Sequence, residues 1–293
     1  MKDPTGGMDA ARLPAISRHT IPGPVARQTH TIMKITNRTF IISGGSSGLG
    51  LATVEDLLTS GAYIAILDQK PPQDQFDAQR VRFFQVDITE VAQIASAVDD
   101  VASWTKETGA HLGGVINCAG VGVAAKIIDA HNEPHSLDLW DFAIAVNLTG
   151  SFNLTRLALK HLIVVPPEEG DDGERGLVIF VASSAAFEGQ PGQVAYSATK
   201  GAVASMTLPM ARDLARHAVR VLTIAPGPFS SPMTAGFPDK TRRSLEGSGG
   251  IVYPRRFGLP YEFARTVRWA VETPIVNGEV VRLSGAGRMP GKL

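Results

Sequence analysis

Short apolar runs alternate along the chain with stretches of helical character. Seven of these runs are rich in β-branched residues and have the length of buried strands: residues 39–45, 62–68, 81–87, 113–120, 176–184, 219–227 and 278–285. Each of the first six is followed by enough chain for a crossover or a loop. Strands that are apolar on both faces and alternate with helices form parallel sheets covered by helices on both sides. The pattern therefore predicts an α/β fold with three layers.

The composition is that of one globular domain and excludes some classes of partner. Of the 293 residues, 44% are hydrophobic and 19% are charged, and 28 basic residues balance 28 acidic ones. Without a basic block, neither nucleic acid nor an anionic membrane is expected as a partner. No apolar run approaches the roughly 20 residues that cross a bilayer. The single cysteine, Cys118, cannot form an internal disulfide, so we expect a reducing compartment.

The two ends of the chain differ from the part between them. Residues 1–35 contain scattered prolines and glycines and are predicted to be a poorly ordered extension, followed by one domain at residues 36–293. Residues 10–34 contain bases but no acid, as transit peptides do, although their prolines fit a plain unstructured extension equally well. The chain closes on Gly291-Lys292-Leu293, a variant of the peroxisomal S-K-L address. Mitochondrion, peroxisome and cytosol are all open on these grounds.

The first predicted strand runs into a loop rich in glycine. In parallel sheets a ligand binds at the carboxyl ends of the strands. Here the segment "SGGSSGLGLA" (43–52) carries Gly44, Gly48 and Gly50 and leads into a helix predicted over residues 51–60. Such a turn brings backbone amides close to a pyrophosphate at the positive end of the helix, whereas an ordinary turn is the alternative. Its position between a strand and a helix favours a dinucleotide site, with further contacts from Ser46, Ser47 and Leu49.

An acidic residue ends the second predicted strand. A carboxylate at Asp68 can accept both hydrogen bonds of an adenosine ribose diol and repels a 2′-phosphate, although a solvated loop acid is the alternative. No Lys or Arg stands at Ser47 or Gln69, so we predict NAD(H) over NADP(H). Further cofactor contacts are expected where the third and fourth strands end, at Asp87, Ile88, Asn117, Ala119 and Gly120. Cys118 is interpreted as a small apolar filler, not a nucleophile.

A tyrosine and a lysine share one face of a later helix. Tyr196 and Lys200 are spaced i, i+4, a spacing that also occurs by chance on many helices. A free tyrosine has a pKa of about 10, and a nearby ammonium lowers it by stabilising the phenolate. Such a pair can take a proton from an alcohol or return one to a carbonyl. Ser183 and Ser184, at the end of the fifth strand, are both candidates to hold the substrate oxygen.

Together these motifs resemble the short-chain dehydrogenases/reductases. The signature consists of "GGSSGLG", "NCAG", "VNLTG", a serine thirteen residues before "YSATK", and "APG", in that order, and the resemblance covers about residues 35–290. It implies a Rossmann-type, doubly wound sheet of seven parallel strands, a nicotinamide cofactor and a Ser-Tyr-Lys-Asn constellation.

Carried over residue by residue, the resemblance implies a role for each member of that constellation. Tyr196 becomes the general acid/base, and Lys200 lowers its pKa and holds the nicotinamide ribose. Ser183, not Ser184, steadies the substrate oxygen, and Asn147 holds a water through which Lys200 exchanges protons. The same resemblance places four further residues at the nicotinamide: Pro226, Gly227, Phe229 and Ser231.

Within that family, several segments are similar to a group named type 2 3-hydroxyacyl-CoA dehydrogenases. They are "AAFEGQPGQVAYSATKGAV", "MTLPMARDLA", "TIAPGPF", "NGEVVRLSGAGRM" and the insertion around "HNEPHSLDLWDF". This resemblance implies NAD-dependent oxidation of an L-3-hydroxyacyl-CoA to the 3-ketoacyl-CoA, tolerance of other secondary alcohols including steroids, and a homotetramer. Relatives in the group are mitochondrial, which favours the mitochondrion here. Expected substrate contacts are Ser183, Gln190, Gln193 and Tyr196.

Other features leave alternatives open. Residues 237–258, where a substrate lid is expected, depart from that group, so a reductase of a secondary-metabolite pathway with another carbonyl substrate is the alternative. A protein that binds the dinucleotide without turnover is disfavoured, because all four residues of the constellation are present. His131 and His135 are interpreted as loop histidines, and no metal is expected. The arginines that flank the lid could receive coenzyme A phosphates or merely cover surface: Arg242, Arg243, Arg255 and Arg256.

Overall fold

The structure is a computed structural model that describes residues 35–169, 172–237, 239, 242, 245, 251–289 and 291. The predicted extension lies outside the described residues except for Ile35, which is buried in the core. Lys292 and Leu293 of the carboxyl-terminal tripeptide also lie outside them. The predictions on transit peptide and peroxisomal address therefore concern residues that are not described.

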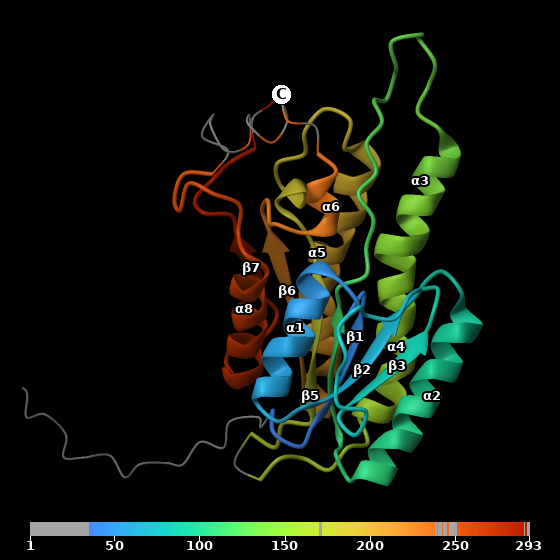
Figure 1. The fold of residues 1–293 in the computed structure, drawn as a ribbon, viewed down its shortest axis with the longest axis vertical. Coiled ribbons are helices and arrows are strands. Elements are labelled where there is room, and N and C mark those ends of the chain that lie inside the picture. The colour runs from blue at the N-terminus through green and yellow to red at the C-terminus, as the bar shows by residue number, and fades with distance from the viewer. Residues whose placement is uncertain are drawn as a thin grey trace, which may run out of the picture. The chain divides into compact units, whose positions relative to one another are not determined.

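Seven parallel strands form one sheet, in the order β3-β2-β1-β4-β5-β6-β7, which confirms the predicted fold class (Figure 1). The strands are β1 (Thr39–Ser43), β2 (Tyr63–Asp68), β3 (Val81–Gln85), β4 (Leu112–Asn117), β5 (Gly176–Val181), β6 (Val219–Pro226) and β7 (Val280–Leu283). Most of the predicted apolar runs extend one to three residues past these carboxyl ends, because their last residues leave the sheet and form the loops above its edge.

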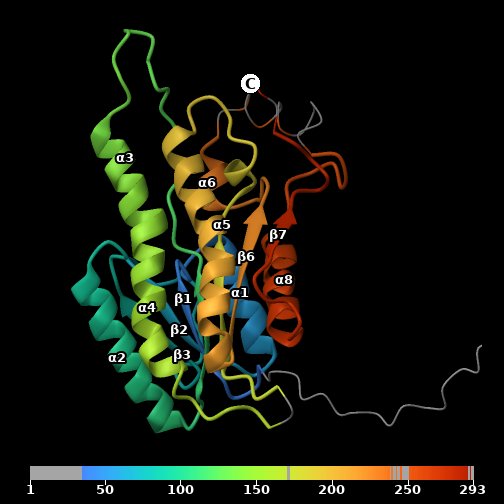
Figure 2. The ribbon, with the colours of Figure 1, turned by 180° about the vertical axis from the view of Figure 1, so that it is seen from behind.

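Helices cover both faces of the sheet, as Figures 1 and 2 show from opposite sides. Phe40 and Ile42 pack with α1 and α8, while Ile41 between them faces the other way, toward α2, α4 and α5. This alternation explains why the strands are apolar throughout. The helices are α1 (Gly48–Thr59), α2 (Val91–Thr108), α4 (Ser151–Leu162), α5 (Val194–Leu214) and α8 (Pro260–Glu272).

One long helix contains a π-helical segment in its middle. The helix α3 (Leu137–Ala143) continues through a π-helical segment, η1 (Ile144–Gly150), into α4. A hairpin held by pairing of Ile128 with Pro134 precedes α3 and projects beyond it. π-helical turns within α-helices are frequent at functional sites, and this one contains Asn147. Further short helices in the described part of the chain include η2 (Ser184–Ala186), η3 (Ala215–His217) and α6 (Pro232–Ala235).

The order of the strands places a crevice at one edge of the sheet. β1 pairs with β2 on one side and with β4 on the other, so successive connections leave in opposite directions from this point. Ligands of open α/β sheets bind at such a point, outside the carboxyl ends of the strands. Among the described residues, no helix is both long and apolar enough to cross a membrane.

Candidate active site

The loop after β1 has two positions that only glycine can occupy. A Cβ on Gly50 would lie 2.1 Å from the carbonyl oxygen of Gly44, and one on Gly44 would lie 2.7 Å from the amide nitrogen of Ala119. Gly44 also has a φ of +66°, in the left-handed region that favours glycine. The helix α1 begins at Gly48, three residues earlier than predicted, so the glycine loop forms its first turn. The amides at this end of the helix can bind an anion such as pyrophosphate.

The carboxylate of Asp68 lies beside the glycine loop. Its oxygens accept hydrogen bonds from the amides of Ser46 (3.1 Å) and Gln69 (2.8 Å). The Gln69 side chain donates to Asp87 (3.0 Å), whose other oxygen accepts from the amide and hydroxyl of Thr89 (2.9 and 2.7 Å). The bonds from Thr89 hold the pKa of Asp87 below its ordinary value.

Two of the predicted cofactor contacts, Asn117 and Phe229, have buried side chains. Asn117 is 2% exposed and donates to the Thr155 hydroxyl (3.1 Å) and the Ile179 carbonyl (3.4 Å). Phe229 is 7% exposed and its ring lies edge-to-face with that of Phe263, with 6.4 Å between centroids. At both positions only the main chain can reach a bound cofactor.

The other predicted contacts lie in the loops above the crevice or at its base. Ile88 is buried, and a Cβ on Gly150 would lie 2.7 Å from its carbonyl oxygen. The amide of Ala119 donates to the hydroxyl of Ser43, at 3.3 Å. The loop after β4 thus lies against the end of β1, and the loop after β3 lies against η1.

The helix α6 reaches across toward the glycine loop. Pro226 ends β6, and the amide of Gly227 after it donates to the Leu283 carbonyl at 2.8 Å. Ser231 precedes α6, and a Cβ on Gly48 would lie 3.5 Å from the Ser231 Cβ. The next residue but one, Met233, faces Gly122 in the loop after β4. Sequence reasoning did not identify Met233, since a lone methionine has no motif.

Ser183 and Tyr196 come together from different elements. Ser183 follows β5 and caps η2, where its hydroxyl accepts from the amide of Ala185 at 3.1 Å. Tyr196 lies in the first turn of α5 and is hydrogen-bonded to Ser183. Ser184 is buried, with 4% of its surface exposed. Of the two candidate serines, Ser183 is thus the one beside the phenol.

The pKa of Tyr196 shifts opposite to the direction expected from Lys200. Loss of water around the phenol raises the pKa of Tyr196, and the hydrogen bond from Ser183 is what lowers it in part. Lys200 Nζ lies 5.8 Å from the centre of the Tyr196 ring and donates instead to the Val181 carbonyl at 2.8 Å. Burial lowers the pKa of Lys200 to about 8. Desolvation, which disfavours the charged form of each group, is therefore the largest cause of both shifts.

Asn147 is held beside Lys200 by a neighbouring loop. Its side-chain oxygen accepts from the Val121 amide (2.8 Å), and its amino group donates to the Val121 carbonyl (3.0 Å) and the Thr199 hydroxyl (3.2 Å). A Cβ on Gly120 would lie 3.1 Å from Asn147 Oδ1 and 3.4 Å from Lys200 Nζ. The structure thus gathers all four catalytic candidates. Thr199, which sequence reasoning missed, lies inside the "YSATK" motif and was detectable there.

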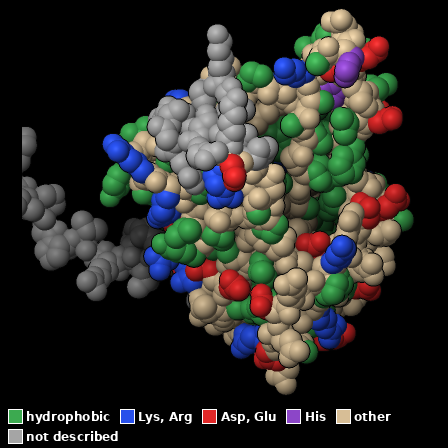
Figure 3. Space-filling view, turned by 45° about the horizontal axis from the view of Figure 1, so that its top comes forward, with side chains coloured by type: hydrophobic (Ala, Val, Ile, Leu, Met, Phe, Trp, Pro, Cys, Tyr) green, Lys and Arg blue, Asp and Glu red, His purple; other side chains and the backbone are tan. Residues whose placement is uncertain are grey.

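The predicted substrate contacts Gln190 and Gln193 lie in the loop between η2 and α5. The Gln190 amide donates to the Gln193 side-chain oxygen (2.9 Å), and the Gln193 amide donates to the Gln190 carbonyl (3.0 Å). Exposed apolar side chains of the hairpin and of the start of α3 include Ile127, Ile128 and Leu137. Figure 3 shows apolar side chains gathered along the hollowed face below the hairpin's histidines.

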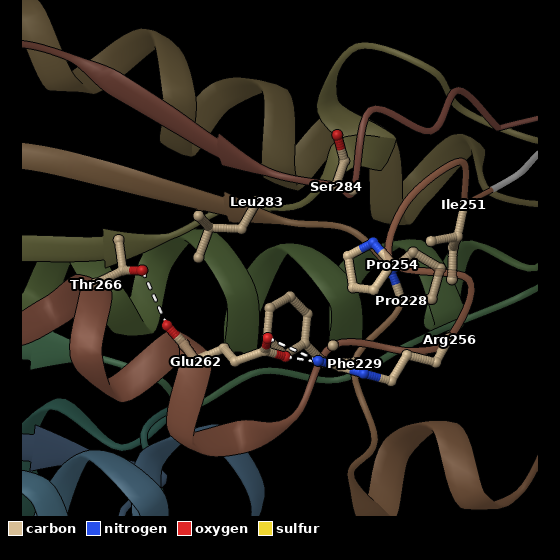
Figure 4. A pocket seen from close by; sticks show the side chains of 11 residues that line it. Pro228, Phe229, Ile251, Pro254, Arg256, Glu262, Thr266, Leu283 and Ser284 are labelled. Atoms are coloured by element: carbon tan, nitrogen blue, oxygen red, sulfur yellow. Dashed lines mark hydrogen bonds and ion pairs between the residues drawn. The ribbon is translucent and has the colours of Figure 1, made fainter.

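Two of the four arginines that flank the expected lid, Arg242 and Arg256, have partners within the protein. Arg256 donates through both Nη atoms to Glu262 (2.8 and 2.9 Å), which lowers the pKa of Glu262 to about 2. This pair lines a pocket of about 250 Å³ beside Phe229 (Figure 4). Arg242 lies over the Phe257 ring, 5.2 Å from its centre. Arg243 lies outside the described residues, and Arg255 is exposed.

Comparison with known proteins reveals one family and several similar enzymes. The family described as short chain dehydrogenase matches residues 38–242. The chain is 41% identical to the 3-hydroxyacyl-CoA dehydrogenase type-2 of Rattus norvegicus over 85% of its own length and 94% of the relative's. It is 29% identical to the ipsdienol dehydrogenase of Ips pini, over 88% of this chain and 99% of that enzyme. The crystal structure of 3-hydroxyacyl-CoA dehydrogenase type-2 from Mycobacterium avium superimposes with a TM-score of 0.78 at 31% identity, covering 89% of this chain and all of that one.

Proposed function

This chain belongs to the short chain dehydrogenases, and from that we propose that it interconverts a secondary alcohol and a ketone, the alcohol being an L-3-hydroxyacyl-CoA. As a member of the family it is an oxidoreductase that uses a nicotinamide dinucleotide and acts on a small molecule. The observation that carries the reaction is the Ser183–Tyr196 hydrogen bond beside Lys200, at the sheet edge that also bears the glycine loop. The names of its relatives support the acyl-CoA substrate.

The residues at this edge divide the chemistry between them. A nicotinamide bound there would supply the acceptor for the hydride that leaves the alcohol carbon. In alcohol oxidation the Tyr196 phenolate takes the hydroxyl proton. The electrons of the O–H bond then form the C=O bond, and the hydrogen on the alcohol carbon leaves as hydride with the electrons of the C–H bond. The Ser183 hydroxyl donates to the substrate oxygen. Lys200, with a pKa of about 8, can pass the proton on from Tyr196 near neutral pH. Carbonyl reduction uses the neutral phenol as the acid.

The geometry fits a nicotinamide dinucleotide, and the local charges favour NAD over NADP. The absence of a side chain at Gly50 lets the loop after β1 pack directly against the first turn of α1, whose amino end can bind phosphate. Asp68 would hold the adenosine ribose. With Asp87 two residues past β3, this region carries two carboxylates and would repel a 2′-phosphate.

Replacing Asp68 by serine is expected to reverse this preference. Loss of a hydrogen bond to a charged group costs about 1.5–3 kcal/mol, so Kd for NAD should rise about 10- to 100-fold. The Kd for NADP should fall, because a like charge is removed. Isothermal titration with both dinucleotides measures the two constants. Asp99→Ser, on the exposed side of α2, is the control and should change neither. An unchanged ratio of the two constants in Asp68→Ser would exclude Asp68 as the selecting residue.

Purified full-length protein with NAD and 3-hydroxybutyryl-CoA is expected to form NADH, which its absorbance reports. The apolar wall near the hairpin should accept the acyl chain, so longer straight-chain substrates should be turned over as well. A panel of steroid, terpenoid and simple secondary alcohols provides the comparison. If only members of that panel react, the reductase of a secondary-metabolite pathway displaces the acyl-CoA enzyme. The similarity to ipsdienol dehydrogenase supports that alternative.

We propose that the protein assembles as a homotetramer. Phe152 on α4 and Leu208 on α5 are exposed by 43% and 45%, although both are large and apolar. Trp269 on α8, which covers the opposite face of the sheet, is exposed by 43%. Two separate apolar faces would each bury themselves against a second copy, and two different two-fold contacts generate a tetramer.

A further inference from the structure

Glu188 lies midway in the loop that joins Ser183 to Tyr196. Its amide donates to the Ser184 carbonyl at 3.0 Å, which fixes it directly behind η2. The next residue, Gly189, lies against α5, since a Cβ there would be 2.6 Å from the Ser197 hydroxyl oxygen. The loop therefore touches the neighbours of both catalytic candidates. Glu188 is thus joined directly to η2 and, through Gly189, to the first turn of α5.

The carboxylate of Glu188 is bound by residues from the end of the chain. Oε1 accepts from Arg282 on β7 and lies 3.2 Å from Arg288 Nε, and Oε2 accepts from the Met289 amide at 2.8 Å. The side chain is 13% exposed, so solvent screens these charge-assisted bonds little. The Arg282 guanidinium also lies over the Phe187 ring, 5.2 Å from its centre. Two consecutive residues of the loop are thus held by one arginine of the sheet.

Met289, whose amide binds Glu188, also contacts the region where a substrate lid was expected. The side chain of Met289 packs against a small apolar cluster formed by Leu245, Ile251 and Phe257. These residues belong to the part of the chain between α6 and α8, where sequence reasoning placed the substrate lid. Through Glu188 and Met289, residues 288–289 connect the Ser183–Tyr196 loop with that segment.

We propose that Glu188 is a positioning residue, which holds the Ser183 hydroxyl against Tyr196 by tying the loop between them to β7 and the terminal segment. This proposal rests on the proposed function, because it assigns Glu188 a part in that reaction. Glu188 touches neither substrate nor cofactor. Its carboxylate sets the distance between two groups that do, and loss of such alignment by about 1 Å can cost 10²-fold in rate.

The test is Glu188→Gln with a control of equal burial. Glu168 is also 13% exposed and pairs with Arg38, but it lies in the loop before β5, at the opposite edge of the sheet. In assays with NAD and 3-hydroxybutyryl-CoA, kcat of Glu188→Gln should fall about 10- to 100-fold, while Kd for NAD changes less than twofold. Glu168→Gln should keep the wild-type kcat even where its melting temperature falls. Glu188→Asp keeps the charge and should retain more of kcat than Glu188→Gln.

The pH profile separates positioning from mere stability. Oxidation needs the phenolate, so its rate should rise with pH through the ionisation of Tyr196. The groups that face Tyr196 are Ser183 from the loop and Lys200 from its own helix, with Cys118 of the loop after β4 near Lys200. Loosening Ser183 removes the hydrogen bond that lowers the pKa of Tyr196. The rising limb of the profile should therefore move to higher pH in Glu188→Gln and stay in place in Glu168→Gln.

Several outcomes would overturn the proposal. Equal kcat values and unshifted profiles in both glutamine variants would make Glu188 a stabilising residue only. If Glu188→Gln does not fold, Arg282→Gln, which removes the arginine bound to Glu188 Oε1, is judged by the same shift, and a wild-type profile there refutes positioning. If the wild type oxidises no alcohol at all, the proposed function fails. The phenolate absorbance of Tyr196, taken as the difference between each protein and its Tyr196→Phe form, then still decides whether Glu188 affects its pKa.

Discussion

Replacing Tyr196 by phenylalanine is expected to lower kcat by about 10²- to 10⁴-fold and to leave the affinity for NAD unchanged within a factor of two. The substitution removes the hydroxyl that bonds to Ser183 and keeps the ring. Lys200 can pass a proton on from Tyr196 but does not replace it beside Ser183, because its Nζ donates to the Val181 carbonyl. Steady-state formation of NADH measures kcat, and isothermal titration measures NAD binding.

A second tyrosine provides the control for this substitution. Tyr63 is half-buried like Tyr196, but it begins β2, at the end of the strand away from the crevice. Its ring packs against that of Trp104 on α2, with 5.8 Å between the ring centroids. Tyr63→Phe should retain full turnover. If Tyr196→Phe turned over substrate as fast as Tyr63→Phe, the assignment of the acid/base to Tyr196 would be refuted. A loss of NAD binding in Tyr196→Phe would instead show that the phenol maintains the cofactor site.

Replacing Gly50 by alanine is expected to weaken NAD binding by about 10- to 100-fold and to lower the free energy of unfolding. The new Cβ would lie 2.1 Å from the Gly44 carbonyl oxygen and 2.8 Å from its carbon, and both are backbone atoms that cannot rotate away. Forcing extra volume into such a contact costs about 1–3 kcal/mol, and 1.4 kcal/mol is tenfold in affinity. Isothermal titration with NAD and chemical denaturation measure the two effects.

Gly201→Ala is the matched control, because Gly201 is also a glycine inside a helix. A Cβ at Gly201 would meet its nearest atom, the Ala186 carbonyl oxygen, at 3.9 Å, an ordinary contact. The control should leave NAD affinity unchanged and gain up to about 1 kcal/mol of stability, since alanine favours helix over glycine. If Gly50→Ala bound NAD as tightly as Gly201→Ala, the glycine loop would not be the pyrophosphate site.

Sequence reasoning proposed a site at the ends of the strands, but it did not indicate where each side chain points. Asn117 ends β4 and Phe229 lies three residues past β6, and both side chains are buried. Which way a residue points where a strand becomes a loop depends on neighbours from other segments: Thr155 for Asn117, and Phe263 for Phe229. Those neighbours are 38 and 34 residues away along the chain, and no local pattern encodes them.

The amino-acid sequence by itself determined the order of strands and helices and the kinds of side chain at the site. Seven apolar runs, a glycine loop before a helix and the Tyr196–Lys200 spacing are local features, because strand and helix periodicities act over a few residues. Only the tertiary structure decided that burial raises the pKa of Tyr196 and that Glu188 pairs with Arg282, 94 residues away. Burial and charge pairing depend on contacts between distant segments, which exist only once the sheet and its helices have packed.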